Sequence, residues 1–123
     1  MNTFYLIAGL IALSATVGHF LVGYKEFLKP VLDSNTGPIP QQVMRSLFHY
    51  MSIFQIFSTL TFLLAAFNKL PFHTDGILLL AFIYASFGLV QIYVALTSKI
   101  KGGLFKLFQW IFWILIAVSA LLG

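Results

Sequence analysis

The stretch that decides the fold is Thr3–Tyr24, TFYLIAGLIALSATVGHFLVGY, which contains no charged residue. The hydrocarbon core of a bilayer is about 30 Å thick, and an α-helix needs about 20 apolar residues to cross it. This stretch is long enough, and no basic residue precedes it as one would in a cleavable secretory signal. We therefore expect a membrane-spanning helix that is retained in the protein.

Three further stretches have the length and apolar character of a span, namely Val43–Phe67, Asp75–Thr97 and Leu104–Leu122. All are continuously apolar rather than alternating, which favours helices over the strands of a membrane barrel. We expect the helices to end at prolines and glycines, which occur in Lys29-Pro30, Gly37–Pro40, Pro71 and Gly102-Gly103. The expected connections are then residues 25–42, 68–74 and 98–103. The prediction is a single all-α membrane domain over residues 1–123, folded as an antiparallel four-transmembrane-helix bundle.

The composition excludes several classes of protein. Of the 123 residues, 60% are hydrophobic and only 8% are charged, whereas soluble domains carry about 25% charged residues. A nucleic-acid-binding surface needs clustered basic residues, and here seven Lys and Arg are scattered along the chain. The absence of cysteine excludes disulfides, thiolate metal sites and a cysteine nucleophile. The partner that the composition indicates is the lipid bilayer.

The placement of the basic residues predicts the orientation. Six of the seven lie in or beside the first and third connections, and only Lys69 lies in the second; the six are Lys25, Lys29, Arg45, Lys99, Lys101 and Lys106. Connections rich in Lys and Arg face the cytoplasm. We therefore expect the first and third connections in the cytoplasm, both termini on the other side, and a location in a bacterial inner membrane.

One strongly polar residue in each expected span lies at a similar depth below the cytoplasmic face. His19 and Gln109 lie about 8 Å deep, and His49 and Gln91 lie about 9 Å deep, at 1.5 Å per helical residue. Ionisable and polar side chains inside a membrane are costly and mark functional sites. These four residues are therefore candidates for a ligand-binding site.

Two charged residues and a polar track extend this candidate site. Glu26 shares a helical face with His19 and Gly23, and Arg45 shares one with His49, so Glu26 and Arg45 are expected to pair above the histidines. Below His49, the side chains of Ser52, Gln55 and Thr59 continue along the second span, with Gln55 near the middle of the membrane. Ser14 and Thr16 are their possible partners across the helices, or bond back to their own helix.

Three interpretations of this layer stay open. Neutral imidazoles of His19 and His49 are able to bind a transition metal or to flank a haem, and nearby aromatic residues suit a flat apolar cofactor or other small ligand; these are Phe20, Phe48, Tyr50, Trp110 and Trp113. The layer also fits hydrogen bonds that only fix the register of the helices. A proton or ion path through the histidines is the third interpretation.

The pattern favours a protein that is not an enzyme. The three acidic residues, Glu26, Asp33 and Asp75, lie at boundaries or in connections, so no paired carboxylates or Ser–His–acid set forms inside a span. Small four-helix multidrug exporters carry a carboxylate in their first span, where this chain has His19. Four-helix enzymes of eicosanoid and glutathione metabolism carry an Arg, His, Asn, Glu pattern in the second span, of which only Arg45 and His49 are present.

The first half of the chain resembles a group of small bacterial four-span membrane proteins. The shared pattern is Gly18-His19 with Gly23, then Glu26, then Leu28-Lys29-Pro30, then Arg45 ahead of Phe48-His49 and Ser52. In this chain the acid lies further from the histidine, and Phe48 replaces the usual Trp. The resemblance implies four spans and directs attention to His19, Gly23, Glu26, Arg45 and His49 without implying a particular chemistry.

The resulting hypothesis is a small inner-membrane protein whose polar site binds a metal, a haem or a small ligand. The candidate site residues are His19, His49, Gln91, Gln109, Glu26, Arg45 and Gln55, with His19 and His49 as possible metal ligands. The alternatives are an accessory or assembly subunit of a larger membrane complex, and a small channel or exporter. A homo-oligomer is compatible with each of them.

Overall fold

The computed structural model describes residues 1–71 and 73–123, without the side chain of His73, and all regular elements in that part of the chain are helical. In chain order they are α1 (Thr3–Gly18), the π-helix η1 (His19–Leu28), α2 (Lys29–Leu32), α3 (Pro38–Ala66), α4 (His73–Thr97), α5 (Gly103–Lys106) and α6 (Gln109–Leu122). The all-α prediction is therefore confirmed.

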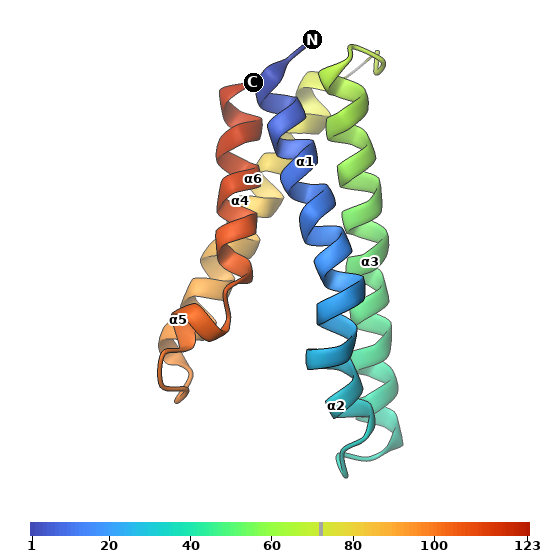
Figure 1. Ribbon diagram of the computed structural model, residues 1–123, viewed down its shortest axis with the longest axis vertical. Helices are drawn as coiled ribbons and strands as arrows, with labels where there is room; N and C mark the ends of the chain where they lie inside the picture. The colour runs from blue at the N-terminus through green and yellow to red at the C-terminus, as the bar shows by residue number, and fades with distance from the viewer. Residues whose placement is uncertain (72) are drawn as a thin grey trace.

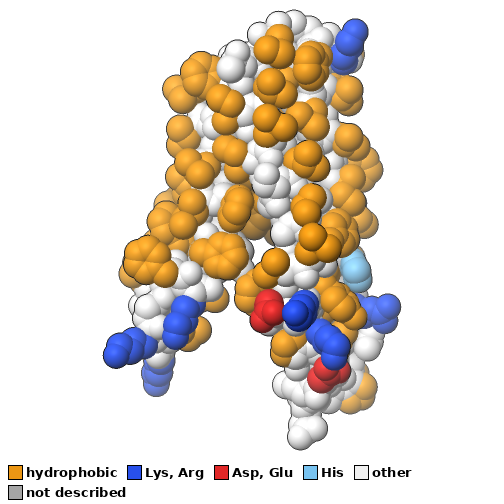
Figure 2. All heavy atoms as spheres, in the orientation of Figure 1, with side chains coloured by type: hydrophobic (Ala, Val, Ile, Leu, Met, Phe, Trp, Pro, Cys, Tyr) orange, Lys and Arg blue, Asp and Glu red, His pale blue; other side chains and the backbone are white. Residues whose placement is uncertain are grey.

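Three helical segments are long and apolar enough to cross a membrane: Thr3–Leu32, Pro38–Ala66 and Thr74–Thr97. Their outward faces are covered by large apolar side chains, which form the broad hydrophobic surface in Figure 2. Such a surface is far larger than a soluble monomer exposes, and it is what contact with a lipid bilayer requires. The prediction of a membrane protein with transmembrane helices is confirmed at this level.

The fourth expected span differs from the prediction. The helix expected over 104–122 is broken, and α6 is a 14-residue helix, about 21 Å long. Trp110 explains the break, because its indole Nε1–H donates to the carbonyl oxygen of Leu104 over 2.8 Å. That carbonyl is thereby engaged by a side chain, and Leu107 leaves the helical conformation with φ −102° and ψ 61°. The chain thus has three helices of spanning length and one shorter apolar helix.

The first connection is shorter than expected. We predicted it over 25–42, but η1 continues directly into α2, and only residues 33–37 lie between α2 and α3. Pro38 does not end a helix, because it occupies the first turn of α3, where a helix has no use for the missing N–H. Pro30 does not end one either, since the helical segment passes through it from η1 into α2. Gly37, with φ 99°, makes the turn into α3.

The helices are arranged in two pairs, as Figure 1 shows: α1 runs beside α3, and α4 runs beside α6. A glycine allows close approach within each pair. A Cβ on Gly9 would lie 2.7 Å from the side chain of Leu63, and one on Gly88 would lie 2.5 Å from Ile114. The pairs meet where α1 contacts α6, and they diverge away from the two termini.

The two ends of the molecule differ in packing and in charge. We call the end with both termini the closed end and the end with α2 and α5 the open end (Figure 1). The closed end holds the core, in which Tyr84, Phe62, Ile77 and Ile116 are fully buried. Most Lys and Arg side chains gather at the open end, on both helix pairs (Figure 2). The charge asymmetry seen in the sequence thus becomes an asymmetry between the two ends.

Candidate functional site

Polar side chains pair across the seam between the first helical segment and α3. His19, the first residue of η1, places its Nε2 2.8 Å from the Ser52 hydroxyl and 3.1 Å from the Phe48 carbonyl oxygen. One turn closer to the closed end, the hydroxyls of Thr16 and Thr59 lie 3.2 Å apart. These contacts confirm that Thr16 bonds across the helices as well as to its own helix, where its hydroxyl donates to a backbone carbonyl.

The bonds of His19 define which ring nitrogen carries the proton. The Ser52 hydroxyl donates to the Phe48 carbonyl oxygen over 3.0 Å, so its own oxygen is left to accept. An Nε2–H of His19 then has two acceptors, whereas a bare Nε2 would face the lone pairs of the Phe48 carbonyl. We assign the proton of the neutral ring to Nε2, which leaves Nδ1 as an acceptor. The imidazole also stacks on the Phe48 ring, with 3.9 Å between centroids and 16° between planes.

A cavity of about 350 Å³ lies between the two helix pairs where they diverge toward the open end. In Figure 2 the outline of the molecule is notched between the pairs at that end. Residues of α1, η1 and α3 form one wall, and residues 108–113 form the other. Its aromatic lining comes from Phe27, Phe48, Phe108, Phe112 and Trp113, and its polar lining from Ser14, His19, Gln55 and Gln109.

Gln55 is the exceptional residue of this cavity. It lies on α3 between Ser52 and Thr59, which both bond across the seam, and it is only 2% exposed. Its Oε1 is buried and has no hydrogen-bond partner among the described residues. Buried polar atoms are almost always paired, and an unpaired one costs about 1–3 kcal/mol. Gln55 lines the cavity, and its amide therefore holds an unused hydrogen-bonding atom enclosed in the cavity wall.

The opposite wall brings together the two glutamines that we expected at one level. Gln91 of α4 donates from Nε2 to Oε1 of Gln109 over 3.4 Å, which is a long contact. The Nε2 of Gln109 makes no hydrogen bond that the structure describes, and Gln109 lines the cavity. From the second helix pair, Gln109 thus lines the cavity directly, and Gln91 contacts Gln109 without lining the cavity.

The structure does not bring His49 to the cavity. His49 is exposed, and its ring meets the edge of Phe48 rather than the imidazole of His19. Among the residues described, no group of three or more His, Asp or Glu side chains is placed to hold a metal ion. Shared ligation of a metal or haem by the two histidines stays a prediction.

Glu26 and Arg45 are both exposed, and they form no ion pair with one another. Within the described chain the ion pair at this end joins Lys29 and Asp33, with Nζ 2.6 Å from Oδ2. The π-helix gives the physical reason. Its i→i+5 hydrogen bonds place more residues in each turn than an α-helix has, so Glu26 no longer shares a face with His19.

The same π-helix shapes the cavity wall. π-Helical turns are rare and occur frequently at functional sites, and here ten residues adopt this form. Gly23 is buried against Phe48, where a Cβ would lie 3.5 Å from the ring. That distance is an ordinary van der Waals contact, so the approach of Phe48 does not require a glycine, and the close approach expected at Gly23 stays a prediction.

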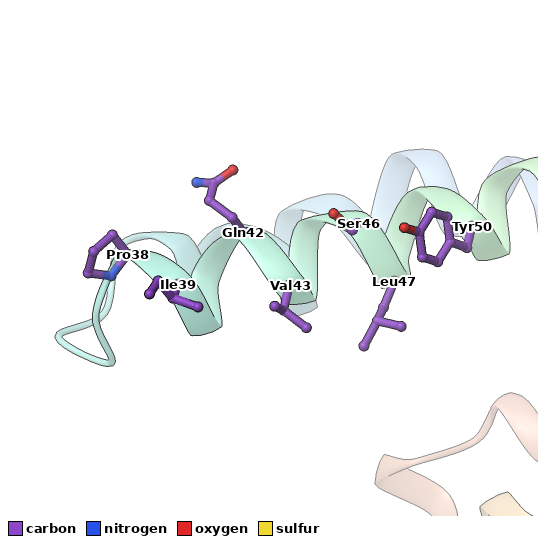
Figure 3. Close-up of a pocket in the computed structure, with 7 residues that line it drawn as sticks. All are labelled: Pro38, Ile39, Gln42, Val43, Ser46, Leu47 and Tyr50. Atoms are coloured by element: carbon purple, nitrogen blue, oxygen red, sulfur yellow. The ribbon is translucent and has the colours of Figure 1, made fainter.

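A second concavity lies on the outer surface of α3, and Figure 3 shows its lining. It has a volume of about 490 Å³, but all its residues belong to one helix, so it is a surface groove rather than an enclosed site. Ile39, Val43 and Leu47 follow one another at every fourth position and point to the same side. Tyr50, which we expected near a cofactor, lies in this groove and not in the cavity.

Sequence reasoning missed two residues of the core beside the site. The hydroxyls of Ser58 on α3 and Tyr84 on α4 are hydrogen-bonded in the interior, and the Tyr84 ring packs on Trp113 with centroids 5.6 Å apart. A tyrosine in the middle of an apolar helix, and a serine three residues after Gln55, were the only signals. Tyr84 adjoins the cavity through Trp113, which lines it.

Comparisons with protein-family models, with curated proteins and with solved structures give no match to this chain.

Proposed function

We propose that this chain is an inner-membrane protein in which α5 and α6 act as the fourth membrane element of an antiparallel four-helix bundle. The long helices α1–α2, α3 and α4 supply the other three elements. The basic residues at the open end support an orientation with that end in the cytoplasm and with both termini on the other side. Anionic lipid headgroups then neutralise the lysines of α2 and α5.

We further propose that the cavity between the helix pairs binds a small membrane-soluble molecule. The single observation that carries this proposal is the buried Gln55 amide, whose Oε1 lacks a partner while its neighbours on α3 are paired. A membrane offers no water to satisfy such an atom, so a bound molecule would remove a cost of about 1–3 kcal/mol. The aromatic walls supply the apolar contact area that ligand cavities usually have.

The geometry supports an organic ligand better than a metal or a haem. Nε2 of His19 is engaged by Ser52 and by the Phe48 carbonyl, and His49 lies outside the cavity. A metal held by both histidines would bind Nδ1 of His19 and would require the exposed His49 side chain to turn inward. A visible absorbance spectrum and a metal analysis of the purified protein test that alternative directly.

A cavity-filling substitution tests the proposal. A Cβ at Gly18 meets no atom within 4 Å, and this residue lines the cavity, so Gly18→Leu should fill the space without disturbing the backbone. Gly76 of α4 is equally free of neighbours and does not line the cavity, so Gly76→Leu is the matched control. We expect native mass spectrometry to find a bound molecule on the wild type and on Gly76→Leu, and none on Gly18→Leu. An unliganded wild type would contradict the proposal.

An accessory subunit of a larger complex is the second candidate, and the groove on α3 favours it. This helix of 29 residues is about 43 Å long, so part of it extends beyond a hydrocarbon core of about 30 Å. The exposed side chains of Ile39, Val43 and Leu47 lie near its first turns and form a face suited to a partner helix. The same mass spectra would then show a stoichiometric protein partner instead of a small molecule.

A further inference from the structure

The lining of the cavity restricts the charge of its ligand. No Lys, Arg, Asp or Glu is among the lining residues, and the polar ones that face the space are Ser14, His19, Gln55 and Gln109. A charged ligand would have no counter-ion there, and burial of an unpaired charge is prohibitively costly. The cavity therefore favours an uncharged molecule.

The unpaired polar atoms of the α1–α3 wall restrict the hydrogen bonding of the ligand. Ser14 is already satisfied, because its hydroxyl donates to the backbone of its own helix over 2.9 Å. Oε1 of Gln55 is an acceptor without a partner, and Nδ1 of His19 is an acceptor in the tautomer that its other bonds define. A complementary ligand must present a hydrogen-bond donor to this wall.

The size and walls of the cavity restrict the shape of the ligand. Its volume of about 350 Å³ lies near the lower end of the range for ligand pockets, about 300–1,000 Å³. Aromatic side chains from both pairs, including Phe48, Phe112 and Trp113, face this space. A single ring, or the head of a lipid with part of its chain, fills a space of this kind.

We propose that the ligand is an uncharged, membrane-soluble molecule with a hydroxyl group, and that the Gln55 amide, which is enclosed in the cavity wall, turns to accept a hydrogen bond from this hydroxyl through Oε1. This inference rests on the proposed function and specifies the ligand class of the same cavity. The divergence of the two helix pairs at the open end gives the molecule a route between them, without passage through the core of the closed end.

Fluorescence of Trp113 reports on the cavity, which this residue lines. Of the two tryptophans, Trp113 lines the cavity and Trp110 does not. Both are kept, because loss of the Trp110 bond to the Leu104 carbonyl would alter the wall formed by residues 108–113, and excitation that tyrosine does not absorb selects the two indoles. The probes are para-bromophenol, which donates a hydrogen bond, and para-bromoanisole, whose methyl group removes that donor while keeping the ring and the quenching bromine. A third probe, the para-bromophenyl trimethylammonium cation, tests charge. All are added to protein in lipid nanodiscs and compared at equal mole fraction in the bilayer.

We expect quenching by the phenol to saturate, with half-saturation at a mole fraction about 3- to 18-fold lower than for the anisole. This fold-change corresponds to the free energy of one hydrogen bond inside a membrane. Gln55→Met keeps the length of the side chain and removes its oxygen, so it should bring the two probes to the same half-saturation. Ser14→Ala is the matched control, because it changes a lining hydroxyl that is already paired, and it should preserve the difference.

The outcomes separate this inference from the proposed function. Saturable quenching with no preference between phenol and anisole would overturn the hydroxyl assignment and leave a ligand cavity in place. A preference for the trimethylammonium cation would overturn the uncharged class. Quenching by every probe that rises linearly, without saturation, in the wild type and in Gln55→Met alike would mean that the cavity binds none of them, and the proposed function itself would fail.

Discussion

At the closed end, buried polar side chains are paired between helices. One turn of α3 nearer the open end, Oε1 of Gln55 is buried and has no partner in the part of the chain that the structure describes. The Ser58 and Tyr84 hydroxyls illustrate the first situation, since they bond to each other within an aromatic core. The side chain of Asn2, at the surface of the same end, is also paired, because its Oδ1 caps α1 and its Nδ2 donates to the backbone carbonyl of Gly123. Among the described residues, the unpaired buried side-chain atom is thus Oε1 of Gln55, away from the paired groups of the closed end.

The two ends also differ in how the helices approach one another. Gly9 and Gly88 let the partners of each pair come close, and the residues beside them are buried. At the open end the pairs diverge, and aromatic rings face a cavity instead of a packed neighbour. Packing, rather than hydrophobic burial, holds helices together inside a membrane. The closed end should therefore carry most of the stability.

The largest expected effect compares one substitution at the two ends. Phe62 is fully buried in the core of the closed end, so Phe62→Ala leaves a cavity and should lower the free energy of unfolding by about 3–5 kcal/mol. Phe48 is half-buried beside the existing cavity, and Phe48→Ala should cost about 1–2 kcal/mol. Unfolding in mixed micelles with increasing denaturing detergent measures both. Equal losses would show that stability is not concentrated at the closed end.

A smaller effect is expected from adding one methyl group to a glycine at each end. A Cβ at Gly9 would lie 2.7 Å from the Leu63 side chain and 3.3 Å from its backbone nitrogen, so Gly9→Ala should force α1 and α3 apart at a cost of about 1–3 kcal/mol. Gly18→Ala meets no neighbour within 4 Å and should stabilise its helix by about 0.4–1 kcal/mol. Thermal unfolding in the same detergent should give opposite signs, and a shared sign would contradict the packing difference.

Much of the architecture was predictable because it follows from composition. Apolar stretches of spanning length and uneven placement of lysine predicted the helices, their order and the difference in charge between the ends. The fourth helix was predicted too long, because the bond from Trp110 to the Leu104 carbonyl breaks it, and an apolar sequence does not reveal such a bond. The first connection was predicted too long, because the helical segment passes through Pro30 from η1 into α2, and because Pro38 occupies the first turn of α3, where proline is compatible with a helix.

The candidate site was predictable only in part. Depth along the helices placed Gln91 and Gln109 at one level, where the structure has them in contact. Polarity placed Ser52, Gln55 and Thr59 on one track below His49, whereas in the structure Ser52 bonds to His19 and Gln55 lines the cavity with it. The π-helix could not be foreseen, and it changes which residues share a face, so Glu26 and Arg45 do not pair. Nor could the sequence indicate that His49 faces outward, since an α-helix with apolar residues on all sides gives no periodicity to orient it.

The last prediction concerns the sign of a change from a polar to an apolar side chain. In protein freed of bound molecules, Gln55→Met removes an unpaired buried amide and should raise the free energy of unfolding by about 1 kcal/mol. Ser58→Ala, one turn further toward the closed end, leaves the Tyr84 hydroxyl without its partner and should lower the free energy of unfolding by about 1 kcal/mol. Denaturation in mixed micelles measures both. If Gln55→Met destabilised the protein as Ser58→Ala does, the amide would be a structural group, and the open end would not differ from the closed end in this respect. A gain in stability would instead mean that Gln55 lowers the stability of the wild type and that its packing does not offset this loss.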